Sequence, residues 1–339
     1  MRLDEFDYSL PAEAIAQVPV EPRDAARLLV DRGTAPPEHR TVADLPDLLR
    51  AGDVVVVNET KVIPARLRLQ RATGGQAEVL LLEPQDPGRR HWEALVRPAR
   101  KLKEGEELQS SDGRPVLVVG ARTRAGDTFH VHLVDVSGVD ALALLDDVGE
   151  VPLPPYITAR LERPDRYQTV YANQPGSAAA PTAGLHLTPE LLDRIRAVGA
   201  TIHPVELVVG LDTFQPVTVQ DVADHRMHSE RYRVPGSTWA ACQGAGRVVA
   251  IGTTSVRALE SAAATGNLSG RTELFLRRGS TFHVVDVLLT NFHLPHTTLL
   301  MMIDAFVGPR WRELYATALA SGYRFLSFGD AMLLDRNAR

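Results

Sequence analysis

The chain has 339 residues, of which 44% are hydrophobic and 23% charged, and its formal net charge is -5. These values are typical of a globular protein and argue against intrinsic disorder and against nucleic-acid binding through overall positive charge. The single cysteine, Cys242, excludes an internal disulfide framework and a cysteine-based zinc site. We found no apolar run long enough to span a membrane and no signal-peptide core in residues 1–23. We therefore expect a cytoplasmic protein.

Residues 1–62 have mixed α/β character. The β-branched run at 53–58 is too short for a helix and predicts a buried strand. Asn58 and Thr60 come at its carboxyl end, where they either close the strand in an Asx turn or contact a ligand.

Residues 63–150 have a different pattern, with short apolar runs separated by glycine-containing turns. Phe129, Val131 and Leu133 alternate with polar residues, as in a strand with one buried face. Strands this short and this closely spaced indicate a small barrel or sandwich. The sequence thus predicts an α/β main domain, residues 1–62 plus 151–339, with an inserted all-β, barrel-like domain at 63–150.

The densest basic stretch overlaps this insertion. From Thr60 to Ser110 there are ten Lys or Arg residues against seven Asp or Glu, which leaves a local charge of +3. A solvated surface explains such a cluster, and a contact with a phosphate backbone is the alternative.

The loop at 180–188 is rich in small residues and contains Pro181, Thr182, Gly184 and His186. It ends at Thr188, a typical N-cap residue that is followed by proline and glutamate. Such a loop offers backbone donors, a hydroxyl and a titratable group to a ligand. A tight turn with a histidine bonded to a neighbouring carbonyl is the alternative.

Two further loops follow apolar strands near the C-terminus. The strand at 248–251 leads into Gly252, Thr253 and Thr254 and a helix predicted from residue 256, with Arg257 on its first turn. Amides and hydroxyls at a helix N-terminus bind anions, although a well-capped helix with a surface arginine has the same pattern. The strand at 284–289 leads into a loop that contains Asn291 and His293. A last strand is predicted at 323–328.

A group of three potential ligands lies between the loop at 180–188 and the strand at 248–251: His225, His228 and Glu230. Their spacing permits a metal site, a hydrogen-bonded acid/base group or a surface cluster. Because no fourth ligand is evident, we expect no metal. A metal-dependent hydrolase built on these three residues remains an alternative that chelation would test.

Several motifs in this order resemble those of one known family. They are FDY at 6–8, IAQ at 15–17, EPRD at 21–24, VIPARL at 62–67, PLPPYI at 152–157, YQTVYA at 167–172, APTAGLH at 180–186, MHSE at 227–230, GTT at 252–254 and LTNFHLP at 289–295. On these motifs the chain resembles the S-adenosylmethionine:tRNA ribosyltransferase-isomerases of queuosine biosynthesis, nearly end to end.

The resemblance implies an α/β domain with an inserted β-barrel. It also implies transfer and isomerisation of the ribosyl moiety of S-adenosylmethionine onto 7-aminomethyl-7-deazaguanine at the tRNA wobble position, giving epoxyqueuosine-tRNA, adenine and methionine. No cofactor beyond this co-substrate is expected, and we expect a monomer.

The chemistry needs a base for the acidic C5′ proton beside the sulfonium and an acid for the departing adenine. His186, His228, His293 and Glu230 are the candidates for these steps. The substrate-binding candidates are polar or small residues of the same motifs: Asn58, Thr60, Arg66, Pro181, Thr182, Gly184, Gly252, Thr253, Thr254, Arg257 and Asn291. Arg257 and the amides of residues 252–254 suit the methionine carboxylate.

The chain departs from the family pattern at two places. Val208 and Asp212 stand where the family usually has histidine and glycine, and Arg278 begins a turn that usually begins with proline. These departures keep two alternatives open. One is a divergent enzyme that uses S-adenosylmethionine as ribosyl donor to another acceptor, and the other is a catalytically weakened tRNA-binding homologue.

Overall fold

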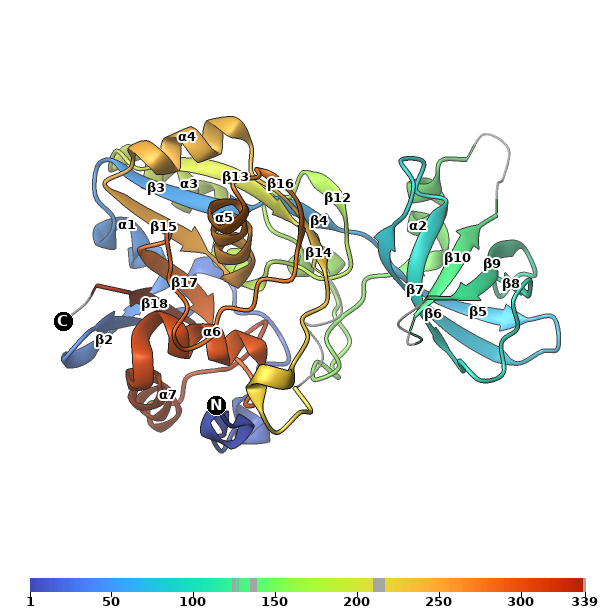
Figure 1. Cartoon of the computed structure of the whole chain (residues 1–339), viewed down its shortest axis with the longest axis horizontal. Coiled ribbons are helices and arrows are strands. Elements are labelled where there is room, and N and C mark those ends of the chain that lie inside the picture. Colours follow the sequence, from blue (N-terminus) through green and yellow to red (C-terminus); the bar gives the residue numbers. More distant parts are fainter. Residues whose placement is uncertain (124–125, 127, 135–138, 210–216, 338–339) are drawn as a thin grey trace. The chain divides into compact units, whose positions relative to one another are not determined.

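The structure is a computed structural model, and it describes residues 1–123, 126, 128–134, 139–209 and 217–337. The chain forms two compact units (Figure 1). The first comprises Met1–Thr60, Pro155–Gln174 and Ala180–Arg339, and the second comprises Lys61–Pro154 and Pro175–Ala179. Where the sequence suggested one insertion at 63–150, the second unit thus also takes in a short segment after residue 174.

The first unit is built on a nine-stranded mixed sheet. In spatial order its strands are β16 (Ser269–Thr272), β14 (Glu230–Arg233), β13 (Thr201–Leu207), β3 (Asp53–Asn58), β15 (Arg247–Ile251), β17 (Val287–Asn291), β18 (Ala331–Asp335), β1 (Arg27–Arg32) and β2 (Ala35–Thr41). The four strands from β13 to β17 pair in parallel. Their carboxyl ends therefore meet at one edge of the sheet, where open α/β sheets bind ligands.

Helices cover both faces of this sheet. They are α1 (Leu45–Leu48), α3 (Pro189–Ala197), α4 (Gly236–Gly244), α5 (Thr253–Thr265), α6 (Thr298–Val307) and α7 (Trp311–Ala320). In β3, Val54 and Val56 pack in the core that contains residues of α4, α5, α6 and α7, whereas Val55 and Val57 pack in the core with α1 and α3. Burial on both faces explains why this strand has a continuous apolar run instead of an alternating pattern.

Short 3-10 turns join many of these elements. They are η1 (Leu3–Phe6), η2 (Ala12–Ala14), η3 (Arg23–Ala25), η4 (Val42–Asp44), η5 (Pro164–Tyr167), η6 (Thr182–His186), η8 (Val222–Asp224) and η9 (Gly308–Arg310). The helix start predicted at Thr188 is present, because the Thr188 hydroxyl accepts a hydrogen bond from the amide of Leu191 at 3.1 Å.

The two outer strands of the sheet are β16 and β2. Among the described residues, strand β2 pairs with β1 alone, and it contains Pro36 and Pro37. Near these prolines the register between the two strands shifts.

The second unit is a closed antiparallel barrel. Its strands are β5 (Arg66–Arg71), β6 (Gln76–Pro84), β7 (His91–Arg97), β10 (Phe129–Leu133), β9 (Pro115–Arg122) and β8 (Glu107–Gln109), and β8 pairs back with β5 to close the ring. Strand β11 (Gly149–Glu150) adds to β5, and α2 (Ala141–Val148) packs Leu144 and Leu145 into the barrel core. Strands β4 (Thr60–Val62) and β12 (Gln174–Ser177) lie where the chain passes between the units. The predicted fold class, an α/β domain with an inserted β-barrel, is confirmed.

The prediction of a last strand at 323–328 is wrong. Apart from one bridge between Phe325 and Ile15, this segment turns, with Leu326 at a φ of 69°. The carboxylate of Asp330 holds the turn because it accepts from the amides of Arg27 and Arg324 at 2.9 and 2.8 Å. The last strand is β18, which begins directly after this turn.

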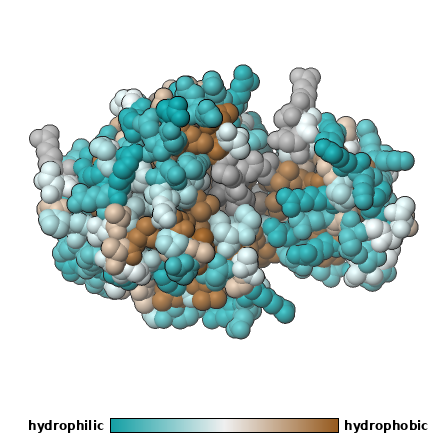
Figure 2. All heavy atoms as spheres, turned by 90° about the horizontal axis from the view of Figure 1, so that it is seen from below, coloured by the Kyte–Doolittle hydropathy of each residue, from teal (hydrophilic) through white to brown (hydrophobic). Residues whose placement is uncertain are grey.

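In the described part of the chain, every helix is too short or too polar to cross a membrane. Figure 2 shows a face on which hydrophilic residues predominate and hydrophobic residues appear as separate patches.

Candidate functional site

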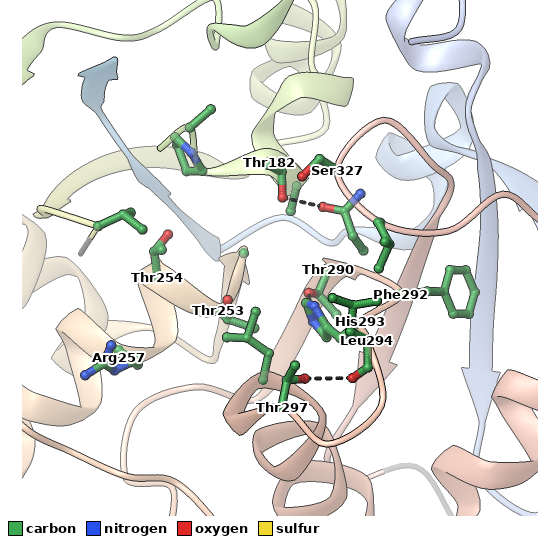
Figure 3. A pocket seen from close by; sticks show the side chains of 18 of the residues that line it. Thr182, Thr253, Thr254, Arg257, Thr290, Phe292, His293, Leu294, Thr297 and Ser327 are labelled. Atoms are coloured by element: carbon green, nitrogen blue, oxygen red, sulfur yellow. Dashed lines mark hydrogen bonds between the residues drawn. The ribbon is translucent and has the colours of Figure 1, made fainter. Parts of the chain in front are cut away.

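A pocket lies in the first unit at the carboxyl ends of β13, β15 and β17, with about 840 Å³ of space when its opening to solvent is included. Its lining comes from segments far apart in the sequence: Tyr156, Tyr167, Ala180, Pro181, Thr182, Ala183, Leu207, Val209, Glu230, Gly252, Thr253, Thr254, Arg257, Thr290, Asn291, Phe292, His293, Leu294, Thr297, Leu299, Leu326 and Ser327. Figure 3 shows how Thr182, Thr253, Thr290 and His293 surround this space.

The loop between β15 and α5 forms one wall of the cavity. Gly252 has a φ of 86°, which a glycine adopts without strain, and its amide donates to the carbonyl of Leu289 at 2.8 Å. This conformation starts α5 at Thr253, three residues earlier than predicted. The Thr254 hydroxyl is buried and has no hydrogen-bond partner among the described residues. The helix start therefore presents polar groups to the cavity.

Arg257 consequently lies beyond the first turn of α5 and is only 6% exposed. Its Nη1 forms an ion pair with the carboxylate of Glu230, which is 3% exposed. Within the described chain, the Nε and Nη2 groups of Arg257 are buried without a hydrogen-bond partner. These two groups form one side of the guanidinium, a pair of parallel donors that matches a carboxylate.

A smaller pocket, with about 330 Å³ of space when its opening to solvent is included, adjoins the cavity through Arg257 and Leu299, which line both. The rest of its lining is mostly apolar: Met227, Leu274, Phe275, Leu276, Thr298 and Met302. The guanidinium of Arg257 thus stands beside an apolar surface.

Opposite this wall, Asn291 at the end of β17 lies between Thr182 and His186. The Thr182 hydroxyl donates to Asn291 Oδ1 at 2.9 Å (Figure 3). Asn291 Nδ2 lies 3.2 Å from His186 Nε2 and 3.4 Å from the carbonyl oxygen of Asp330. His186 is buried and does not line this cavity.

His293 does line the cavity, and it is 9% exposed. Its Nε2 lies 3.0 Å from the hydroxyl of Thr290. Burial lowers the pKa of His293 to about 3, so the ring is neutral at neutral pH. Of the three candidate histidines it is the one that borders the cavity.

Other predicted site residues lie elsewhere in the first unit. Asn58 is fully buried, and its amide bonds to both backbone groups of Leu207 and to the amide of Thr60, at 3.1–3.3 Å. The Asx-turn interpretation therefore describes this strand end, and neither Asn58 nor Thr60 lines the cavity. A Cβ on Gly184 would lie 1.9 Å from the Tyr171 hydroxyl, which gives this glycine a packing role.

His228 is half-buried and lies outside the cavity lining. Within the described residues, His225, His228 and Glu230 do not form a group that could hold a metal ion. Arg66 belongs to the barrel unit, where its Nη2 lies 3.4 Å from the carbonyl of Leu153.

The position of Val208 bears on the departure from the family pattern. Leu207 and Val209 line the cavity, whereas Val208 does not, as expected for successive residues of an extended chain. Asp212 lies outside the described residues.

Sequence reasoning did not single out Tyr156 and Ser327, which both line the cavity. Their hydroxyls are 2.7 Å apart. Tyr156 lies in the PLPPYI motif, which is the signal that could have indicated it. Ser327 has no such signal, because the sequence predicts a strand over its segment.

Comparison with known proteins agrees with this architecture. The family model described as queuosine biosynthesis protein matches residues 3–334. The S-adenosylmethionine:tRNA ribosyltransferase-isomerase of Symbiobacterium thermophilum is 51% identical over 346 aligned residues, which cover 98% of this chain and 100% of the relative. The enzyme of the same name from Thermus thermophilus is also 51% identical, over 98% of this chain and 99% of the relative.

A solved structure has the same fold. The crystal structure of S-adenosylmethionine tRNA ribosyltransferase from Thermotoga maritima is 36% identical to this chain, with a TM-score of 0.54, and the match covers 97% of this chain and 99% of that one. The chain therefore belongs to the queuosine biosynthesis protein family, that of the S-adenosylmethionine:tRNA ribosyltransferase-isomerases, as its motifs implied.

Proposed function

We propose that this chain transfers the ribosyl moiety of S-adenosylmethionine to the aminomethyl group of 7-aminomethyl-7-deazaguanine at the wobble position of tRNA and isomerises it. The products are epoxyqueuosine-tRNA, adenine and methionine. S-adenosylmethionine is the co-substrate, and the proposal draws on no bound metal.

The free side of the Arg257 guanidinium is the observation that carries the proposal. Nε and Nη2 are buried without partners in the described chain, while Nη1 is held by Glu230. Two parallel donors on a fixed guanidinium fit the methionine carboxylate. The apolar pocket beside Arg257 suits the methylene and methyl groups of the methionine moiety. The rest of the larger cavity then receives the adenosine portion.

His293 is the proposed proton-transfer residue. The sulfonium of S-adenosylmethionine acidifies the neighbouring C5′–H bonds, and a neutral imidazole in the cavity can accept that proton. Because burial lowers the pKa of His293 to about 3, a proton that the ring accepts is readily passed on to the departing adenine. The same burial makes the neutral ring a weak base, so its proton abstraction depends on the acidity that the sulfonium gives the C5′–H bonds. Glu230 holds Arg257 in place, and His186 acts from outside the cavity.

The test is incubation of the protein with S-adenosylmethionine and tRNA that carries the aminomethyl-deazaguanine, followed by mass analysis of the nucleosides. We expect epoxyqueuosine together with equimolar adenine and methionine. S-adenosylhomocysteine, which lacks the sulfonium, and tRNA with guanine at the wobble position are the matched controls. Absence of both adenine and modified nucleoside would contradict the proposal.

The same experiment addresses the divergent alternative. Val208, at the position of the family histidine, is the departure that motivates it, but this side chain does not line the cavity. Adenine release with a ribosyl adduct on another nucleoside of the tRNA, and without epoxyqueuosine, would indicate transfer to a different acceptor.

A further inference from the structure

The amide of Asn291 has one orientation that satisfies its neighbours. The carbonyl oxygen of Asp330, 3.4 Å from Nδ2, can only accept a hydrogen bond. If the amide were flipped, Oδ1 of Asn291 would face the carbonyl oxygen of Asp330, and neither oxygen could donate a hydrogen bond. Nδ2 therefore faces Asp330 and His186, and Oδ1 faces Thr182.

This orientation fixes the polarity of the Thr182 hydroxyl. Asn291 Oδ1 carries no hydrogen, so Thr182 must donate to it across their 2.9 Å contact. A hydroxyl has one hydrogen and two lone pairs. Because Thr182 lines the cavity and its hydrogen is committed to Asn291, it can offer a ligand only a lone pair.

His186 completes this chain of hydrogen bonds from the far side of Asn291. Its Nε2, 3.2 Å from Nδ2, accepts only while it carries no proton. While Nε2 accepts from Asn291, the single hydrogen of the neutral ring lies on Nδ1.

The surroundings of His186 keep the ring neutral. Burial is the main cause, and the charges of Arg324, Arg23 and Arg166 add to it, so that the pKa falls to about 4. The acidic side chains near these arginines already pair with them. Glu21 pairs with Arg166 at 2.7 Å, and Asp330 lies 3.7 Å from Arg324.

We propose that the hydrogen-bonded chain His186–Asn291–Thr182 makes the Thr182 hydroxyl an obligatory acceptor in the cavity. This position then binds a hydroxyl or amine donor of the ligand, and His186 is a positioning residue that takes no part in proton transfer. The identity of that donor rests on the proposed function. It is a ribose hydroxyl of S-adenosylmethionine or the aminomethyl group of the tRNA base.

The first test requires no activity. In protein labelled with ¹⁵N-histidine, with His186→Gln used to assign the signal, we expect His186 to show the neutral Nδ1–H tautomer from pH 8 down to about pH 5. An Nε2–H tautomer, or protonation near the ordinary pKa of about 6.5, would overturn the proposal. The proposed function could fail while this result holds, so the two failures are distinguishable.

The second test uses substrate kinetics. Thr182→Val removes the acceptor at constant volume, and we expect KM to rise about tenfold, as for loss of one ligand hydrogen bond. Thr182→Ser, which keeps the hydroxyl, should restore most of the affinity that is lost in Thr182→Val. A rise for S-adenosylmethionine identifies a ribose hydroxyl, and a rise for tRNA identifies the aminomethyl group. Unchanged KM values for both substrates would refute the assignment.

The third test separates positioning from mere support of the fold. His186→Gln can still accept from Asn291 and should resemble wild type, whereas His186→Met should raise the same KM as Thr182→Val. Arg324→Met removes one charge near His186, so this KM should begin to rise at a higher pH than in wild type. An identical pH profile in the two proteins would contradict the role of the neutral ring.

Discussion

Glu230 and Arg257 form an ion pair in which both side chains are almost completely buried, at 3% and 6% exposure. Arg257→Ala should therefore destabilise the protein as well as weaken substrate binding, because it removes a charged partner of a buried carboxylate. Breaking a buried ion pair in this way costs about 3–5 kcal/mol of unfolding free energy.

Arg257→Lys is therefore the more informative variant. Lysine keeps a positive charge for Glu230 but lacks the parallel Nε and Nη2 donors. We expect affinity for S-adenosylmethionine to fall by about 1.5–3 kcal/mol, as measured by calorimetry, with a much smaller loss of stability than in Arg257→Ala. Wild-type affinity in Arg257→Lys would remove the guanidinium from the carboxylate site.

The barrel provides a second prediction, on tRNA binding. Arg97, Arg100, Lys101 and Lys103 are all exposed, whereas Arg71 is paired with Glu106 at 2.6 Å. If the four exposed residues contact phosphates, replacing all of them with glutamate should flatten the slope of log affinity against log salt by about three units.

The matched control for this experiment is a pair of basic residues of the barrel that already have acidic partners. Arg68 pairs with Glu150 at 3.0 Å and Arg114 with Asp112 at 2.8 Å. Their replacement should change the slope much less. Equal slopes in wild type and the fourfold variant would mean that the cluster is a solvated surface.

Gly184 gives a third prediction, on stability. Because its Cβ would meet the Tyr171 hydroxyl at 1.9 Å, Gly184→Ala should destabilise the protein by about 1–3 kcal/mol in urea unfolding. The Tyr171 hydroxyl is buried without a partner in the described residues, so Tyr171→Phe alone should cost little. Combined with Gly184→Ala, it should recover part of the loss. Additive effects of the two changes would contradict this packing account.

The fourth prediction concerns pH. Burial lowers the pKa of His186 to about 4 and of His293 to about 3, whereas an unfolded histidine titrates near 6.5. Between these values only the unfolded chain takes up the two protons. The unfolding free energy contributed by these groups is therefore fully present above pH 6.5 and falls as the pH is lowered, by up to about 2.7 kcal/mol per pH unit.

Urea unfolding at pH 7, 6 and 5 measures this slope. His186→Gln and His293→Gln should each remove about half of the part due to the two histidines, since each variant removes one titrating group. A double variant with the wild-type slope would show that other groups cause it.

Local signals in the sequence predicted the parts of the site that depend on local geometry. The β-branched run of β3 and the glycine and threonines after β15 form the expected strand and helix start. Arg257 was harder to place because α5 begins three residues earlier than the sequence predicts. A shift of three residues along a helix changes the direction of a side chain around the helix axis by about 300°.

The location of His186 depends on tertiary structure. Its partner Asn291 is 105 residues away in the chain, and Asp330, which fixes the amide of Asn291, is 39 residues further on. No pattern within either motif specifies that the histidine lies behind the asparagine. The sequence brought both residues to the same end of the sheet, but their order from solvent inward comes from the packed fold.

The prolines of β2 have a consequence for how the protein behaves at high concentration. A free sheet edge is a template on which a second chain can add a strand, and extension of this kind leads to fibres or swapped dimers. Pro36 and Pro37 have no amide hydrogen to offer such a strand. The shifted register beside them also interrupts the regular spacing of the remaining donors. At this edge the covalent structure itself opposes aggregation by strand addition.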